Sequence, residues 1–279
     1  MHREGRMDTE VSVVIPTFEA EGLIERCLES VMTQIADAEV IVVDNASTDG
    51  TVARCKNYPV RVIQNGRNVG FGAACNIGVN AANAKYVLLL NQDAVLLTGV
   101  KDAISVLDTT TWAGALGAVM VDGAGRPRPN ALRYPRLDNI ILKRRSYDRR
   151  ASSRLEGSES LVTVEYFEFS FAMMRRQDYV EVGGFDEQYF LYGEERDLTY
   201  RLGARGLRSV LCPTLRYIHD GGYTDARRKL VVDGQVRFIR EHGNFFQRLF
   251  YPTLLGVKSR LARDGARKMQ KSAAQGGEA

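Results

Sequence analysis

Cysteine is scarce in this sequence, and long apolar runs are missing. The four cysteines among the 279 residues lie far apart and form no C-x-x-C pair, which excludes a zinc knuckle and a thioredoxin-type redox motif. Nowhere do about 18 apolar residues run together, and the charged N-terminus has no apolar segment. We therefore expect no membrane span and no signal peptide, and a cytoplasmic protein with reduced thiols.

A strong excess of one charge is also lacking. The sequence has 38 Lys and Arg against 34 Asp and Glu, a net charge of +4 that is too small to indicate nucleic-acid binding. Apolar residues make up 44% and charged residues 26%, which excludes collagen-like, mucin-like and wholly disordered classes. The length predicts one or two domains.

What the sequence does contain is a series of strand-length apolar runs, each followed by a polar turn. The runs are VSVVIP, EVIVVD, VRVIQN and YVLLLN, all within residues 11–97. Between them, apolar residues at helical spacing predict helices over 22–34 and 71–83. This alternation predicts an α/β fold with a mostly parallel, Rossmann-like central sheet flanked by helices. In such sheets ligands bind beyond the carboxyl ends of the strands.

The rest of the chain is more basic and less regular. We expect a helix over 99–109, a strand over 114–121, and a mobile basic segment at 123–160. Residues 227–271 carry twelve Lys and Arg against three Asp and Glu, a charge of +9, and apolar and basic residues mix in 236–262. This mixture predicts an amphipathic helix that lies on an anionic membrane surface. The alternative is a helix that packs on its own domain or on a second copy in a homo-oligomer.

Polar residues suited to a nucleotide follow the apolar runs. They are Pro16, Thr17 and Glu19 after the first run, Asp44, Asn45 and Ser47 after the second, Asn68 and Gly70 after the third, and Asn91 and Asp93 after the fourth. A carboxylate can accept the N3–H of uracil or thymine, and hydroxyls and turn amides can hold ribose or phosphate. Helix capping is the alternative for Asp44 and Ser47.

Five residues are candidates for metal binding or proton transfer. Asp93, a carboxylate just past an apolar strand, suits Mg²⁺ or Mn²⁺, which complete their shell with substrate phosphates and water. His219 ends an apolar run and is a second candidate ligand. Glu194, Glu195 and Asp197 stand close together beside aromatic residues, where a carboxyl pKa can be raised as a general base requires. The alternative for all four acids is a structural role in a turn or at a helix N-terminus.

In this order, the motifs resemble the inverting, GT-A-fold glycosyltransferases of family 2, in particular the bacterial rhamnosyltransferase-like branch. The resemblance covers residues 11–222 approximately. It is carried by Pro16-Thr17-Phe18, Asp44-Asn45-x-Ser47-x-Asp49-Gly50, Asn68-x-Gly70-Phe71-Gly72-x-x-x-Asn76-x-Gly78, Leu90-Asn91-x-Asp93, Gly183-Gly184-Phe185-Asp186-Glu187, Tyr192-Gly193-Glu194-Glu195-x-Asp197-Leu198 and His219.

The resemblance implies a GT-A domain over 1–225, with a nucleotide-sugar half at 8–98 and an acceptor half at 99–225, before a C-terminal extension at 226–279 with a disordered tail. It implies that a sugar moves with inversion from a nucleoside diphosphate, dTDP-rhamnose before UDP-hexoses, to a hydroxyl of a glycan or lipid-linked glycan in cell-surface polysaccharide synthesis. Asp44 would then meet the base, Asp93 and His219 the metal-bound diphosphate, and Glu195 the acceptor hydroxyl.

Two positions depart from the family pattern. Asn91 replaces the first acid of the usual Asp-x-Asp motif, and Glu195 stands where the branch usually has Asp, which leaves Asp197 and Glu194 as fallback bases. Two other classes compete with a transferase: a non-catalytic glycan-binding or scaffold protein on the same fold, and a sugar nucleotidyltransferase. The second is disfavoured because Thr17-Phe18-Glu19-Ala20 stands in place of a Gly-rich, basic triphosphate loop.

Overall fold

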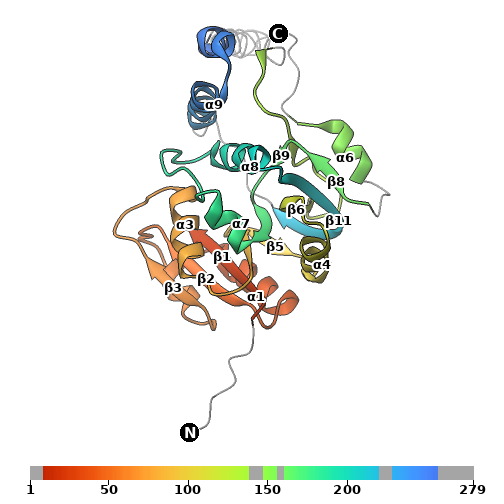
Figure 1. The fold of residues 1–279 in the computed structure, drawn as a ribbon. Coiled ribbons are helices and arrows are strands. Elements are labelled where there is room, and N and C mark those ends of the chain that lie inside the picture. The colour runs from red at the N-terminus through yellow and green to blue at the C-terminus, as the bar shows by residue number, and fades with distance from the viewer. Residues whose placement is uncertain (1–8, 138–146, 156–159, 220–227, 257–279) are drawn as a thin grey trace, which may run out of the picture.

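The computed structural model describes residues 9–137, 147–155, 160–219 and 228–256. Helices surround one large sheet, and two further helices stand apart at the C-terminal end (Figure 1). The sheet strands are β1 (Val11–Thr17), β2 (Glu39–Asp44), β3 (Arg61–Gln64), β4 (Tyr86–Leu90), β5 (Ala94–Leu96), β6 (Ala113–Val121), β8 (Val162–Val164), β10 (Phe171–Arg175) and β11 (Arg208–His219). The helices are α1 (Ile24–Gln34), α2 (Thr51–Cys55), α3 (Phe71–Ala81), α4 (Lys101–Thr109), α6 (Arg149–Leu155), α7 (Arg176–Glu181), α8 (Glu194–Ala204) and α9 (Arg228–His242).

The strand order in the sheet is β3-β2-β1-β4-β10-β6-β11-β5, and β8 pairs with β11. From β3 to β4 all neighbours are parallel, as the strand–helix–strand pattern predicts. Beyond β4 the sheet is mixed, because β10 lies antiparallel between β4 and β6. Between β6 and β10 the chain also forms α6, β8 and the small antiparallel pair of β7 (Ala131–Leu132) with β9 (Tyr166–Phe167).

The core has two layers, one on each face of the sheet. Along β1, Val13 and Ile15 point to the layer formed with α1 and α4, whereas Val14 points to the layer formed with α3 and α8. A Cβ on Gly78 of α3 would lie 2.2 Å from a Val14 methyl carbon, so this helix lies unusually close to the sheet. The predicted helices over 22–34, 71–83 and 99–109 correspond to α1, α3 and α4.

The described parts of the two predicted basic segments are built into the fold. Within 123–160, Ala131 of β7 and Ala151 of α6 are buried in the α3/α8 layer, whereas 138–146 and 156–159 lie outside the described residues. The described part of the C-terminal extension is α9 and a helix of residues 245–256. Residues 257–279, the end of the extension, for which a disordered tail is predicted, lie outside the described residues.

The extension has its own small apolar cluster. Phe238 and Ile239 of α9 pack against Tyr251 and Leu255 of the helix 245–256, and Tyr134 stacks on Phe238 with 5.5 Å between ring centroids. In the described ranges, no helix is long and apolar enough to cross a membrane.

Candidate active site

A cleft of about 940 Å³ lies at the carboxyl ends of β1, β2 and β4. Its lining includes ten of the residues that the sequence predicts for the site: Pro16, Thr17, Asn45, Asn68, Gly70, Asn91, Asp93, Glu194, Glu195 and His219. The other four, Glu19, Asp44, Ser47 and Asp197, lie outside the lining. The structure therefore brings most of the predicted residues together in one cleft, at the strand ends.

Hydrogen bonds connect the ends of the central strands. Thr17 and Asp44 are register partners at the last positions of β1 and β2. Gln92, just past β4, accepts hydrogen bonds from the Thr17 hydroxyl and the Phe18 N–H, both at 2.7 Å. These contacts link the end of β1 to the turn after β4 in the lining of the cleft.

Asp44, Ser47 and Glu19 form a second network beside the cleft. The buried Asp44 carboxylate accepts the Ser47 N–H at 3.2 Å, which is the capping arrangement that competes with base binding. The Ser47 hydroxyl accepts the Glu19 N–H at 3.0 Å, and Glu19 accepts the Thr48 N–H at 2.9 Å. This network shapes the turn after β2, and contact of Asp44 with a nucleobase stays a prediction.

The turn before α3 is shaped by Gly70, which has a φ of 91°. A Cβ there would lie 2.3 Å from the carbonyl oxygen of Phe190, so only glycine permits this approach. The Asn68 side chain accepts the Gly70 N–H at 3.0 Å, and Asn45 donates to the Gly70 carbonyl at 3.2 Å. The Gly70 turn thus joins the end of β2 to the loop that precedes α8.

Asp93 and His219 meet although they are 126 positions apart in the sequence. The pairing of β11 with β5 sets His219 opposite Ala94, next to Asp93. The His219 Nε2 lies 3.2 Å from Oδ1 of Asp93 and 3.3 Å from the side-chain nitrogen of Asn91. A carboxylate oxygen and an imidazole nitrogen this close together suit two neighbouring ligands of one ion, and the mixed donor set fits Mn²⁺ better than Mg²⁺.

Glu194 and Glu195 begin α8, directly after Gly193 with its φ of 115°. Burial, together with the adjacent Glu195 carboxyl, raises the pKa of Glu194 to about 8. Among the described residues, no group donates to the buried Oε2 of Glu194. Glu195 is less buried, lines the cleft, and accepts the Gly193 N–H at 3.0 Å. At neutral pH a proton therefore resides on Glu194.

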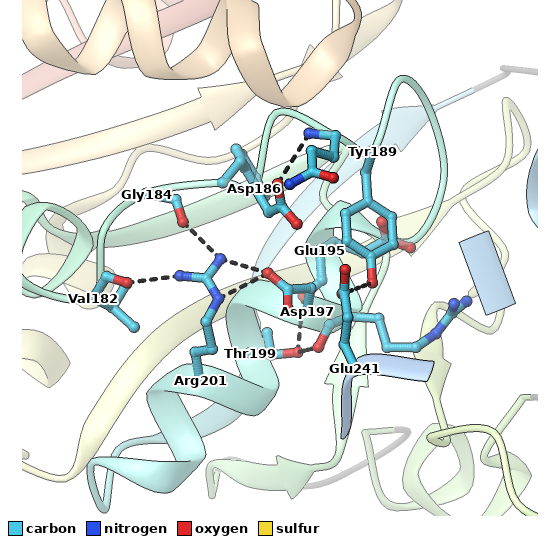
Figure 2. Close-up of polar contacts among 12 residues, drawn as sticks. Val182, Gly184, Asp186, Tyr189, Glu195, Asp197, Thr199, Arg201 and Glu241 are labelled. Carbon is cyan, nitrogen blue, oxygen red and sulfur yellow. Dashed lines mark hydrogen bonds and ion pairs between the residues drawn. The ribbon is translucent and has the colours of Figure 1, made fainter. Parts of the chain in front are cut away.

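Asp197 is hydrogen-bonded through both of its carboxylate oxygens, and Figure 2 shows its contacts with Arg201. Its Oδ2 accepts Arg201 Nε at 2.8 Å, and Arg201 also donates to the carbonyls of Val182 and Gly184, both at 2.7 Å. Its Oδ1 lies 2.7 Å from Nε2 of His242 in α9. Burial raises the pKa of Asp197, but the hydrogen bonds from His242 and Arg201 outweigh it and hold the pKa below its usual range. These contacts tie α8 to its neighbours, away from the cleft.

The cleft also contains charged residues that the sequence analysis did not single out. Arg128 donates to the carbonyl oxygen of His219 at 3.3 Å. Glu168 accepts the hydroxyl of Tyr147 at 2.7 Å, and burial raises the pKa of Glu168. One signal was present: Glu168 is a lone acid between Phe167 and Phe169 in an apolar β-rich run.

A mixed sheet with a polar, acid-bearing cleft at its strand ends is the arrangement that the predicted GT-A fold requires. The family model described as "Glycosyl transferase family 2" matches residues 12–183, which is more than half of the chain. The chain belongs to glycosyl transferase family 2, and it is a glycosyltransferase.

Two relatives resemble most of the chain. The N-acetylglucosaminyl-diphospho-decaprenol L-rhamnosyltransferase of Mycobacterium tuberculosis is 34% identical over 241 residues, which cover 77% of each chain. The rhamnosyltransferase WbbL of Escherichia coli is 28% identical over 222 residues, covering 75% of this chain and 83% of the relative. Both names describe rhamnosyl transfer, and the first describes a lipid-linked acceptor.

Solved structures share the fold. The mannosyltransferase PcManGT from Pyrobaculum calidifontis, in complex with GDP-Man and Mn²⁺, has a TM-score of 0.62 at 19% identity and covers 95% of this chain and 80% of its own. S. aureus TarS 1-349 in complex with UDP-GlcNAc has a TM-score of 0.56 at 19% identity, covering 84% and 66%. These likenesses confirm the predicted GT-A fold.

Proposed function

We propose that this protein transfers a sugar from a nucleoside diphosphate to a hydroxyl group of a glycan or lipid-linked glycan, with inversion at the anomeric carbon, in cell-surface polysaccharide synthesis. One observation carries the proposal: a single cleft holds the Asp93–His219 pair and the Glu195 carboxyl at the strand ends of the sheet. The Asp93–His219 pair is the proposed site for the diphosphate of the donor. The Glu195 carboxyl is the proposed base for the acceptor hydroxyl.

The donor is a sugar nucleotide, with dTDP-rhamnose favoured and UDP-hexoses next. The two rhamnosyltransferase relatives support this order. The nucleotide lies over the ends of β1 and β2, with Asp44, Asn45 and Thr17 near the base and ribose. Asn68 and Gly70 line the cleft next to these residues and shape the turn before α3.

Asp93 and His219 hold a divalent cation, for which Mn²⁺ suits the donor set. The ion supplies positive charge next to the leaving diphosphate. With Asn91 in place of an acid, Asp93 and His219 would hold the ion with one protein carboxylate, and oxygens of the diphosphate and water would complete its ligand set.

Glu195 accepts the proton of the acceptor hydroxyl as its oxygen attacks the anomeric carbon. Burial and the adjacent Glu195 carboxyl raise the pKa of Glu194 to about 8, which favours its protonated form, so the environments of the two neighbours differ. A single base on one face of the sugar gives inversion.

Transfer measured with a panel of sugar nucleotides and a polyprenyl-diphosphate-linked glycan tests this function. We expect transfer from dTDP-rhamnose that EDTA abolishes and Mn²⁺ restores, with product of inverted anomeric configuration by NMR. Retention of configuration would contradict the single-displacement scheme. No transfer and no binding from any sugar nucleotide would favour the scaffold alternative.

We also propose that the helix 245–256 attaches the protein to an anionic membrane surface on its cytoplasmic side. The face of this helix opposite Tyr251 and Leu255 exposes four large apolar residues, Phe245, Phe246, Leu249 and Phe250, with exposed fractions of 73%, 64%, 56% and 48%. Arg248 lies among them, and the sequence around the helix is strongly basic. Apolar insertion plus attraction to anionic lipid is the usual basis of interfacial helix binding.

The C-terminal extension that contains this helix also reaches the cleft. Val231 and Gln235 of α9 line it, so a lipid-linked acceptor on the membrane would approach beside α9. Flotation with anionic and neutral vesicles tests this attachment. We expect the full chain to float with anionic vesicles in low salt, and Phe246→Ser with Leu249→Ser to abolish flotation, while Val180→Ser on the exposed part of α7 does not. Equal flotation of all variants, or loss of a dimer in the double variant, would show that this face serves another purpose.

A further inference from the structure

Glu168 lies in the cleft at a position fixed by the backbone. Its flanking residues Phe167 and Phe169 are buried in the α3/α8 layer, with ring centroids 4.9 Å apart. Glu168 itself is half-buried and lines the cleft, as does Phe169 beside it. The Glu168 N–H donates to the carbonyl of Asn130 at 3.1 Å, and Asn130 is itself bonded to β6.

Among the described residues, the Glu168 carboxyl accepts a hydrogen bond through only one of its two oxygens. Its Oε1 accepts the Tyr147 hydroxyl at 2.7 Å, which holds the group in place. Within the described ranges, Oε2 has no hydrogen-bond partner and the carboxyl forms no ion pair within 4.0 Å. A half-buried acceptor of this kind in a ligand cleft suits a ligand with hydroxyl donors, since an unmet acceptor costs free energy.

The position of Glu168 relative to the proposed chemistry identifies which ligand group it meets. Glu168, His219 and Glu195 line the same cleft, and the Glu168 carboxyl is close enough to both of the others to interact with them electrostatically. In the proposed function, the diphosphate lies at His219 and the acceptor oxygen at Glu195. The transferred sugar is bonded to the diphosphate and is attacked by the acceptor oxygen, so it lies between His219 and Glu195.

We propose that Glu168 binds hydroxyl groups of the transferred sugar and so contributes to the choice of donor. This inference rests on the proposed function and assigns a sugar-binding role to a residue outside the motifs that carry the family resemblance. Two carboxylate oxygens, one held by Tyr147 and one directed at the ligand, provide an orientation-sensitive contact. Sugars that lack a hydroxyl donor at this point lose that contact, which is how a polar site discriminates.

Calorimetric titration of dTDP-rhamnose and of dTDP, both in the presence of Mn²⁺, tests the proposal; UDP-glucose and UDP replace them if the wild type binds those instead. We expect Glu168→Ala to weaken binding of the sugar nucleotide about tenfold or more, since hydrogen bonds to charged groups are among the stronger ones. Binding of the nucleoside diphosphate should stay within twofold. Glu168→Gln and Tyr147→Phe should give smaller losses in the same direction, and they keep the test valid if the alanine variant folds poorly.

The matched control is Glu165→Gln. Glu165 is three positions away, pairs with Arg136 at 2.9 Å and lies outside the cleft lining, so the affinity ratio of sugar nucleotide to nucleoside diphosphate should not change. Equal losses for both ligands, or no loss in any Glu168 variant, would overturn the proposal. A raised KM for the acceptor with unchanged donor binding would also overturn it. If the wild type binds no nucleoside diphosphate at all, the proposed function itself fails, and this inference fails with it.

Discussion

The two adjacent carboxyls at the start of α8 have different environments, and that difference favours Glu195 as the proposed base. Glu195 lines the cleft and is partly exposed, whereas Glu194 is buried with a pKa raised to about 8. Asp197, the next acid along the helix, is bonded to Arg201 and His242. The sequence left all three open, because spacing alone does not show which face of a helix meets the ligand.

Glu195→Gln should lower kcat by about 10²–10⁴ while donor binding stays within a few-fold of the wild type, because only the proton acceptor is removed. Steady-state kinetics together with calorimetric donor binding measure both effects. Asp197→Asn serves as the comparison. If it loses transfer with full stability while Glu195→Gln stays active, the base is Asp197.

Glu194→Gln should stabilise the protein near neutral pH. The raised pKa means that the unfolded chain ionises this carboxyl above about pH 4.3, whereas the folded protein keeps it protonated until about pH 8. Over that interval stability falls with rising pH, by at most about 1.4 kcal/mol per pH unit. Urea unfolding from pH 5 to 8 should show a flatter profile for the variant. An unchanged slope would contradict the burial of an uncharged Glu194.

At the scale of elements, Asp197 joins α8 to both of its neighbours. Arg201 connects it to the turn after α7, and His242 connects it to α9, as Figure 2 shows for the first of these. Tyr189, before α8, donates to Glu241 of α9 at 2.7 Å. The helix that carries the proposed base is therefore held by the C-terminal extension.

Asp197→Ala should destabilise the protein by about 3 kcal/mol, because it leaves a partly buried Arg201 and His242 without their anion. Chemical denaturation measures the loss, with Asp186→Ala, which breaks a more exposed pair to Arg237, as the control. The depressed pKa of Asp197 means that this contribution is present above about pH 4 and is lost as pH falls through the folded pKa. A variant no less stable than the control at pH 7 would contradict this role.

The elements that follow from local pattern were predicted, and those that depend on distant pairing were not. The first four sheet strands, with α1, α3 and α4, are visible in the periodicity of the sequence. The antiparallel insertion of β10 is not, because it depends on which strands β10 meets after a long excursion. The two-residue strands β7 and β9 carry too few residues for a periodic signal.

At the scale of the whole molecule, the fold explains why part of the site was predictable. Parallel strand ends meet at one edge of a sheet, so Thr17, Asn45 and Asp93 could be placed together from sequence. The meeting of His219 with Asp93 rests on the register of β11 with β5, and here the family resemblance supplied what periodicity could not. Glu168 and Arg128 were missed because their placement depends on β6, β7 and β9 together.

The central claim, that a nucleoside diphosphate binds in this cleft through an ion held by Asp93 and His219, is tested most directly by isothermal titration of dTDP and UDP with and without Mn²⁺. We predict binding that strengthens at least tenfold with Mn²⁺ in the wild type, and Asp93→Asn and His219→Ala variants in which Mn²⁺ gives little or no gain. Binding that is equally strong with and without Mn²⁺, or unchanged in both variants, would contradict the account.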